Sequence, residues 1–146
     1  MRILLNTLVL ASFVWSVGPA FAGDKDVTLY KNPQCGCCEG YAAYLRENGF
    51  TVTTRATHDL AEMSREAGIP DEFHGCHLSF IDGYLVSGHV PVSTVEKLLT
   101  ERPDIKGVTL PGMPLGSPGM GGAKEAPFEM LEVTTSGTVG GVYARE

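Results

Sequence analysis

The chain contains 146 residues, of which 43% are hydrophobic, and its 17 acidic and 11 basic side chains give a formal net charge of −6. A protein that binds nucleic-acid phosphates needs clustered lysine or arginine, and this acidic sequence contains no basic cluster. The composition therefore excludes a nucleic-acid-binding protein and suits one domain with its own hydrophobic core.

Residues 1–22 have the three parts of a secretory signal peptide. Met1 and Arg2 supply a positive start, residues 3–17 form an apolar run, and residues 20–22 read Ala-Phe-Ala, which is a typical cleavage site. A membrane-spanning helix needs about 20 apolar residues, so the Gly-Pro pair that interrupts the run favours the signal peptide. No cysteine lies near the cleavage site to carry a lipid anchor.

Cleavage after residue 22 removes 22 of the 146 residues and leaves a mature chain of 124. Without Arg2 this chain has 10 basic and 17 acidic side chains and a formal net charge of −7. We expect residues 23–146 to form a single exported domain in a bacterial periplasm, with no membrane anchor. Thiols in that compartment tend to be oxidised to disulfides or bound to metal.

The first half of the mature chain predicts two strands joined by a helix. Residues 27–30 alternate in polarity and predict a strand. Residues 38–48 place tyrosine and leucine side chains on one face at helical spacing, and Gly49 is a typical C-terminal cap. Residues 50–55 are rich in threonine and valine and predict the second strand.

A second helix and a hairpin follow. Asp59 and Glu62 predict a helix start, Met63 lies on the expected core face, and glycine and proline end the pattern at residues 68 and 70. Two apolar runs, residues 78–81 and 84–86, flank an Asp-Gly pair, which predicts a tight β-hairpin.

The last predicted helix starts at a capping box formed by Ser93 and Glu96 and ends at Pro103. The order β-α-β-α-β-β-α is that of a thioredoxin-like α/β domain, in which a crossover helix joins the first two strands. Residues 104–146 are expected to add a Gly/Pro/Met loop and a C-terminal extension, within which residues 128–133 and 138–143 pair as a hairpin.

Three of the four cysteines lie in the sequence CGCC, at Cys35, Cys37 and Cys38. Cys35 and Cys38 have the C-x-x-C spacing of thiol–disulfide redox sites, and Cys37 is an additional thiol. The predicted helix begins at Cys38, and the free N–H groups of a helix start stabilise thiolate, which is both a nucleophile and a metal ligand. A purely structural disulfide is disfavoured, because a bridge between Cys35 and Cys38 closes a small loop and constrains the unfolded chain little.

Cys76 precedes the predicted third strand. In thioredoxin-like folds the loop at this point packs against the start of the first helix, so we expect Cys76 beside the other three cysteines. Four thiolates exceed the two that a disulfide couple needs. Four thiolates around one Cu(I) ion would carry a charge of −3, which is costly to bury, whereas several Cu(I) ions would neutralise it.

Other soft or borderline ligands lie near these positions in the sequence. His77 follows Cys76 directly and is a candidate metal ligand or a hydrogen-bonding neighbour of one. Met113 and Met120, in the Gly/Pro loop, carry thioether sulfur and are candidates of the same kind. His89 would reach the cysteines only if its loop folds back toward them.

Four motifs in this order, CGCC, GCH, GHVP and PGMPLGSPGM, resemble the CopG-like periplasmic copper-resistance proteins, a family long labelled as a domain of unknown function. The ribbon-helix-helix repressor of the same name is unrelated. The resemblance covers residues 27–120 and implies a thioredoxin-like fold, Cu(I) held by cysteines in a multinuclear cluster, and a copper- and thiol-linked redox role. It assigns the metal to Cys35, Cys37, Cys38 and Cys76.

The leading hypothesis is a periplasmic Cu(I)-binding protein that serves copper tolerance, with Cys35 and Cys38 also acting as a redox pair. Its expected partners are copper ions, periplasmic copper-handling proteins and thiol reductants. One alternative is a metal-free disulfide oxidoreductase that uses only Cys35 and Cys38. Another is a zinc-stabilised interaction module, although CGCC with one distant cysteine departs from the two separated knuckles of structural zinc sites.

Overall fold

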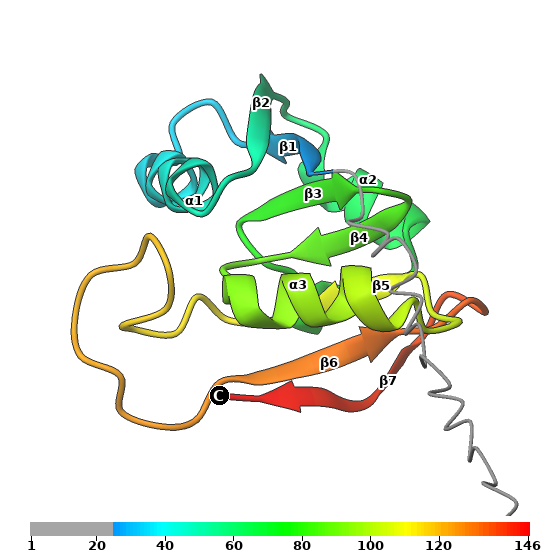
Figure 1. Cartoon of the computed structure of the whole chain (residues 1–146). Coiled ribbons are helices and arrows are strands. Elements are labelled where there is room, and N and C mark those ends of the chain that lie inside the picture. The colour runs from blue at the N-terminus through cyan, green and yellow to red at the C-terminus, as the bar shows by residue number, and fades with distance from the viewer. Residues whose placement is uncertain (1–24) are drawn as a thin grey trace, which may run out of the picture.

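A computed structural model describes residues 25–146 of the chain (Figure 1). The predicted signal peptide, residues 1–22, lies outside the described residues. In chain order the elements are β1 (Asp26–Lys31), α1 (Gly36–Glu47), β2 (Thr51–Ala56), α2 (Leu60–Glu66), the 3-10 helix η1 (Asp71–Phe73), β3 (His77–Ile81), β4 (Tyr84–Ser87), α3 (Val92–Glu101), β5 (Gly107–Thr109), β6 (Glu129–Val133) and β7 (Val139–Arg145).

The strands of residues 25–146 form one seven-stranded mixed sheet in the order β2-β1-β3-β4-β5-β6-β7. β1 and β2 run parallel because α1 carries the chain back to the end of the sheet at which β1 begins. β1 pairs antiparallel with β3, and β3 forms a hairpin with β4 across Asp82 and Gly83, both of which have positive φ. The predicted α/β class and the order β-α-β-α-β-β-α are confirmed, and the arrangement is thioredoxin-like.

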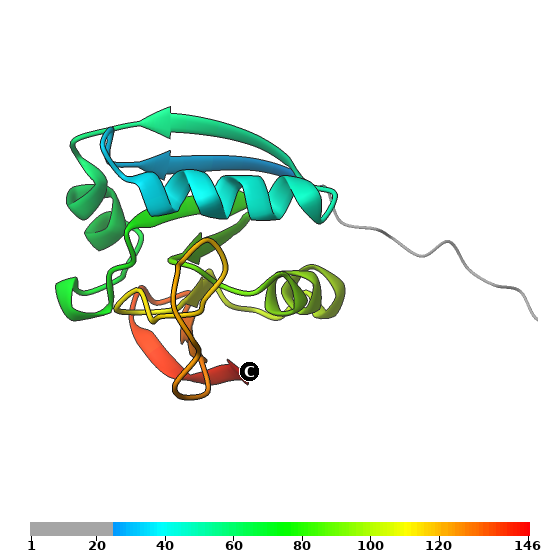
Figure 2. The same cartoon turned by 90° about the vertical axis from the view of Figure 1, so that its left-hand side faces the viewer.

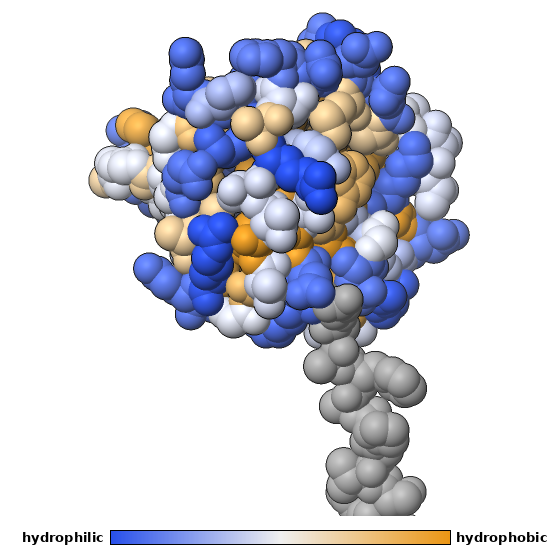
Figure 3. Space-filling view, turned by 90° about the horizontal axis from the view of Figure 1, so that it is seen from above, coloured by the Kyte–Doolittle hydropathy of each residue, from blue (hydrophilic) through white to orange (hydrophobic). Residues whose placement is uncertain are grey.

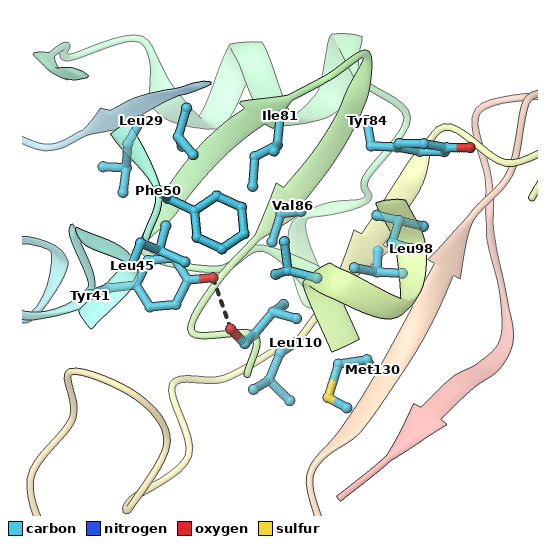
Figure 4. Packing of buried hydrophobic residues seen from close by; sticks show 14 of the residues in the cluster. Leu29, Tyr41, Leu45, Phe50, Ile81, Tyr84, Val86, Leu98, Leu110 and Met130 are labelled. Atoms are coloured by element: carbon cyan, nitrogen blue, oxygen red, sulfur yellow. Dashed lines mark hydrogen bonds between the residues drawn. The ribbon is translucent and has the colours of Figure 1, made fainter. Parts of the chain in front are cut away.

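The two faces of the sheet have separate hydrophobic clusters. α1 and α3 cover one face, where their apolar side chains pack on β1, β3 and β4 (Figure 4). Tyr41 and Leu45 of α1 and Leu98 of α3 are fully buried there, as the helical patterns predict. The hydroxyl of Tyr41 donates to the carbonyl of Val90 at 2.8 Å and so ties α1 to the segment before α3. α2 lies on the other face, where Leu60 is buried and Met63 packs as a partly buried side chain.

Two helix starts differ from the sequence prediction. α1 begins at Gly36 rather than Cys38, because the chain turns just before Gly36, whereas the apolar pattern becomes visible only farther along the helix. The expected capping box of α3 is absent, since Pro91 is the N-cap and the Ser93 hydroxyl donates to the side-chain carboxylate of Glu146. Glu96, the other expected member, pairs with Lys25 at 3.2 Å.

The sheet extends farther than the thioredoxin-like core. The predicted terminal hairpin exists as β6 and β7, and it continues the main sheet because β5 joins it to β4. β5 is buried along its length and has three residues, which is too short for a recognisable pattern. Gly107 permits this pairing, since a Cβ there would lie 1.9 Å from the carbonyl oxygen of Leu85.

Viewed from the side of β2, the molecule presents mainly hydrophilic residues around a narrow hydrophobic strip (Figure 3). Within residues 25–146 no helix has the length and apolar content needed to cross a bilayer.

Candidate metal centre

Three cysteines lie at the N-terminal end of α1. Cys35 is the N-cap residue, with φ −79° and ψ 100°, so that Cys37 and Cys38 belong to the first turn. The backbone N–H of Cys35 donates to the carbonyl of Asn32 at 3.1 Å and closes a turn before the helix. Because N–H groups in a first helical turn lack intrahelical acceptors, this end of α1 favours negative charge on the sulfur atoms.

A buried lysine contacts the segment that leads into α1. Lys31 is 6% exposed, and its amine donates to the carbonyls of Asn32 and Pro33 at 3.3 Å and of Cys35 at 3.5 Å. The same amine pairs with Glu39 at 3.0 Å. A single cation therefore joins β1, the cysteine loop and the first turn of α1.

Cys35 and Cys38 form a disulfide, with their Cα atoms 5.5 Å apart. Cys37 and Cys76 carry free thiols. The structure thus represents the oxidised form of the C-x-x-C pair, in which two of the four sulfur atoms are bonded to each other.

Cys76, in the loop before β3, meets the other cysteines as the sequence predicts. Its Sγ atom lies 3.8 Å from Sγ of Cys37 and 3.5 Å from Sγ of Cys38, and Sγ of Cys37 lies 3.4 Å from Sγ of Cys35. All four sulfur atoms lie within 4.8 Å of one another. Cys38 is fully buried and the other three are partly exposed, so the cluster has an interior part and a part that solvent reaches.

Two glycines set the path of the chain around Cys76. A Cβ at Gly75 would lie 2.4 Å from the backbone nitrogen of Gly88, whose φ is +79°. The N–H of Gly88 in turn donates to the carbonyl of His77 at 3.2 Å. This backbone-to-backbone contact turns the segment after β4 toward the cysteines and places His89 beside Cys76.

The segment that carries His89 folds back toward the cysteines. This histidine therefore reaches them, under the condition that the sequence analysis set. Its Nε2 atom lies 2.9 Å from Sγ of Cys76, and its Nδ1 atom lies 2.6 Å from the carbonyl oxygen of Pro118. A carbonyl only accepts, so Nδ1 carries the proton and Nε2 presents a lone pair to Cys76. The structure thus adds His89 to the candidate site, and in the sequence only the GHVP motif drew attention to it.

His77 lies on the other side of Cys76. Its Nδ1 atom is 3.4 Å from Sγ of Cys76, its ring stacks on Tyr41 with centroids 4.5 Å apart, and its ring lies edge-on to that of His89 at 4.9 Å. The side chain is 1% exposed, and Nε2 has no hydrogen-bond partner within the part of the chain that the structure describes. Cys76, His77 and His89 thus offer one sulfur and two nitrogens within 4.8 Å of one another.

Burial determines the protonation of these groups. It raises the pKa of the Cys76 thiol to about 12, with the nearby Cys37 acting in the same direction. It lowers the pKa of His77 to about 3, helped by His89, and it also lowers the pKa of His89. At neutral pH the metal-free site therefore contains a neutral Cys76 thiol and two neutral imidazoles, the form in which imidazole binds metal.

The Gly/Pro/Met loop, residues 110–122, rises to the side of α1 (Figure 2). Its contact with α1 is between backbones, because a Cβ at Gly40 would lie 2.9 Å from the carbonyl oxygen of Gly119, and a Cβ at Gly119 would lie 2.4 Å from the nitrogen of Tyr41. This contact places the carbonyl of Pro118 against His89. The loop therefore reaches the site through a peptide group.

The two methionine candidates and the two remaining histidines lie outside the contacts that join the cysteines to His77 and His89. The Met113 side chain is 44% exposed, and Met120 is partly exposed. His74 contacts the carbonyl of Ile69 at 2.8 Å, and His58 is exposed. A role for Met113 or Met120 in metal binding remains a prediction.

Comparison with known proteins identifies relatives of the whole domain. Residues 73–120 match the family described as protein of unknown function DUF411. No curated protein matches the chain. Two solved structures, Forms 2 and 1 of a copper resistance protein named CopG, are each 36% identical to the chain and cover 83% of it, and the match includes 97% and 96% of those chains. Their TM-scores are 0.75 and 0.74.

This identity, over most of the chain and nearly all of each of those structures, establishes common descent. The chain therefore belongs to the CopG family of copper resistance proteins.

Proposed function

We propose that this protein binds Cu(I) in a multinuclear site formed by the thiolates of Cys35, Cys37, Cys38 and Cys76, and that it serves copper tolerance in the periplasm. The observation that carries the proposal is the convergence of four sulfur atoms within 4.8 Å of one another. The relatives are named copper resistance proteins, which supports copper as the metal.

The donor set fits Cu(I) by its chemistry. Thiolate is a soft ligand, and neutral imidazole suits copper as well. Four thiolates carry four negative charges, so one Cu(I) ion would leave a charge of −3 in a partly buried site, whereas additional ions reduce that charge. Charge balance therefore favours more than one Cu(I) ion per chain.

Copper binding at this site is linked to the redox state of the protein. In the described form Cys35 and Cys38 are joined in a disulfide, so neither is available as thiolate. A dithiol reductant would transfer two electrons and two protons to this bond and become a disulfide itself. The two cysteines then add their sulfur atoms to those of Cys37 and Cys76. Reduction would thus prepare the site for copper, and oxidation would oppose loading.

A second candidate is a metal-free disulfide oxidoreductase. It is favoured by the disulfide between Cys35 and Cys38 at a helix start, where Cys35 is partly exposed. It leaves Cys37 and Cys76 without a function, although both lie in contact with the disulfide sulfurs. A single zinc ion bound by the four cysteines is a weaker third candidate, because neither hydrophobic cluster contains any of these cysteines.

The test is an anaerobic titration of fully reduced protein with Cu(I) in competition with a strong Cu(I) chelator. We expect more than one ion per chain. Saturation at one ion, or preferential retention of zinc when both metals are offered, would exclude the multinuclear site. Disulfide exchange by copper-free protein with wild-type copper loading in Cys37→Ser would instead support the oxidoreductase.

A further inference from the structure

The disulfide of Cys35 and Cys38 leaves a second set of donor atoms intact. Cys76 keeps its thiol, and His77 and His89 place ring nitrogens at 3.4 Å and 2.9 Å from its sulfur. These three donors come from the end of one loop, from β3 and from the segment after β4, and none of them is part of the disulfide. Cys37 adds a second free thiol 3.8 Å from Cys76.

His89 is oriented in the way that metal-binding histidines are. Such histidines donate one ring N–H to a carbonyl or carboxylate, which fixes the tautomer and directs the other nitrogen to the metal. His89 is 0% exposed, and the carbonyl of Pro118, 2.6 Å from Nδ1, fixes its tautomer and directs Nε2 to Cys76. In the metal-free protein this lone pair accepts the thiol proton of Cys76, and loss of that proton leaves sulfur and nitrogen facing one another as two donors for an ion.

His77 places a second ring nitrogen beside Cys76. It is 1% exposed, and among residues 25–146 its Nε2 atom has no hydrogen-bond partner. Its Nδ1 atom faces Sγ of Cys76 at 3.4 Å. Nδ1 is therefore the His77 nitrogen that an ion held by Cys76 would contact, and Nε2 would carry the proton of the neutral ring.

We propose that Cys76, His77 and His89 form a distinct site that holds one copper ion, as Cu(I), while Cys35 and Cys38 are joined in the disulfide. The ion displaces the thiol proton of Cys76 to solvent, and no electron is transferred. The site shares Cys76 with the proposed four-cysteine site, so the two sites are alternatives for that sulfur. Oxidation of the protein would then lower its copper content to a single ion instead of releasing all of it.

The experiment uses the oxidised protein, titrated anaerobically and without reductant with Cu(I) in the presence of a chelator. A thiol count of two per chain before and after the titration shows that the disulfide survives. We expect one Cu(I) ion per chain. X-ray absorption of the loaded protein should show nitrogen neighbours with the multiple-scattering pattern of imidazole. No bound ion, or a shell of sulfur alone, would overturn the proposal.

The matched variants are His89→Gln, which retains a donor for the Pro118 carbonyl, and His58→Gln at an exposed position. Oxidised His89→Gln should lose the single ion, whereas oxidised His58→Gln should keep it. Retention of the ion by folded His89→Gln would also overturn the proposal. If His89→Gln does not fold, the absorption spectrum of the wild-type protein still decides.

The reduced proteins separate this inference from the multinuclear proposal. Reduced His89→Gln should still bind more than one Cu(I) ion, because its four cysteine sulfurs are unchanged. Reduced wild-type protein that binds only one ion would defeat the multinuclear proposal and leave the site of Cys76, His77 and His89 standing.

Discussion

The sulfur atoms of Cys37 and Cys76 lie 3.8 Å apart although the residues are 39 positions apart in the sequence, and neither takes part in the disulfide. A disulfide exchange site needs neither of them, whereas a thiolate cluster needs both. Substitution of these two residues therefore separates the two candidate functions.

Cys37→Ser and Cys76→Ser should each lower the number of Cu(I) ions bound by the reduced protein, because each removes a thiolate and alters the charge balance of the remainder. Cys35→Ser and Cys38→Ser should lower copper binding and also abolish disulfide exchange. The measurement is bound Cu(I) per chain under reducing conditions, with circular dichroism to verify folding. Full loading of Cys37→Ser and Cys76→Ser would refute the cluster.

Mild oxidation of the copper-free protein should produce the Cys35–Cys38 disulfide and leave two free thiols, on Cys37 and Cys76. Peptide mapping after alkylation identifies which thiols remain. In this oxidised form two of the four sulfur atoms are bonded to each other. Uptake of several Cu(I) ions would therefore contradict the proposal that copper loading requires reduction of the disulfide.

Lys31→Met should lower the free energy of unfolding by about 1–3 kcal/mol, because three backbone carbonyls and Glu39 lose a buried charged donor. Lys25→Met is the control, since its ion pair with Glu96 is largely exposed and should contribute at most about 1 kcal/mol. Urea unfolding of both variants gives the comparison. Equal effects would show that Lys31 does not hold the cysteine loop.

Gly119→Ala should displace the loop from α1. Its φ of +79° costs about 1–2 kcal/mol for a residue with a Cβ, and that Cβ would lie 2.4 Å from the nitrogen of Tyr41. The Pro118 carbonyl should then move away from His89. Gly121→Ala is the control, because a Cβ there meets nothing within 4 Å.

Thermal unfolding and the proton spectrum of His89 report the outcome of this pair of variants. We expect a lower Tm and a lost Nδ1–H signal only in Gly119→Ala. An unchanged signal in both variants would mean that the loop does not fix the imidazole.

Removal of metal by a chelator should leave the secondary structure intact. The hydrophobic clusters on the two faces of the sheet involve none of the four cysteines and supply the cohesion of the domain. Circular dichroism before and after chelation tests this expectation. Unfolding on chelation would favour the zinc-stabilised module instead.

Local signals in the sequence predicted the local structure well. The hairpin of β3 and β4 was predicted because Asp82 and Gly83 can both adopt the positive φ that its turn requires. The capping box of α3 was wrong because Glu146, more than fifty residues away, accepts the hydrogen bond of Ser93. Propensity cannot anticipate a partner that only the folded chain supplies.

The site shows the same division between local and tertiary information. The meeting of Cys76 with CGCC followed from the fold class, because that class fixes which loop faces the start of α1. The position of His89 could not follow from it, since this position depends on the contact between Gly75 and Gly88 and on the loop that carries Pro118. Neither contact has a signature that periodicity or spacing reveals.

A main-chain carbonyl makes the contact between residues 110–122 and His89, so the contact does not depend on which side chains this segment carries. A carbonyl is present whatever side chain is attached, so exposed positions such as Leu115 should accept many substitutions. The glycines that bend the chain should accept few. A saturation library of residues 110–122, selected for growth on copper, should therefore yield variants that differ in their side chains and share one backbone conformation.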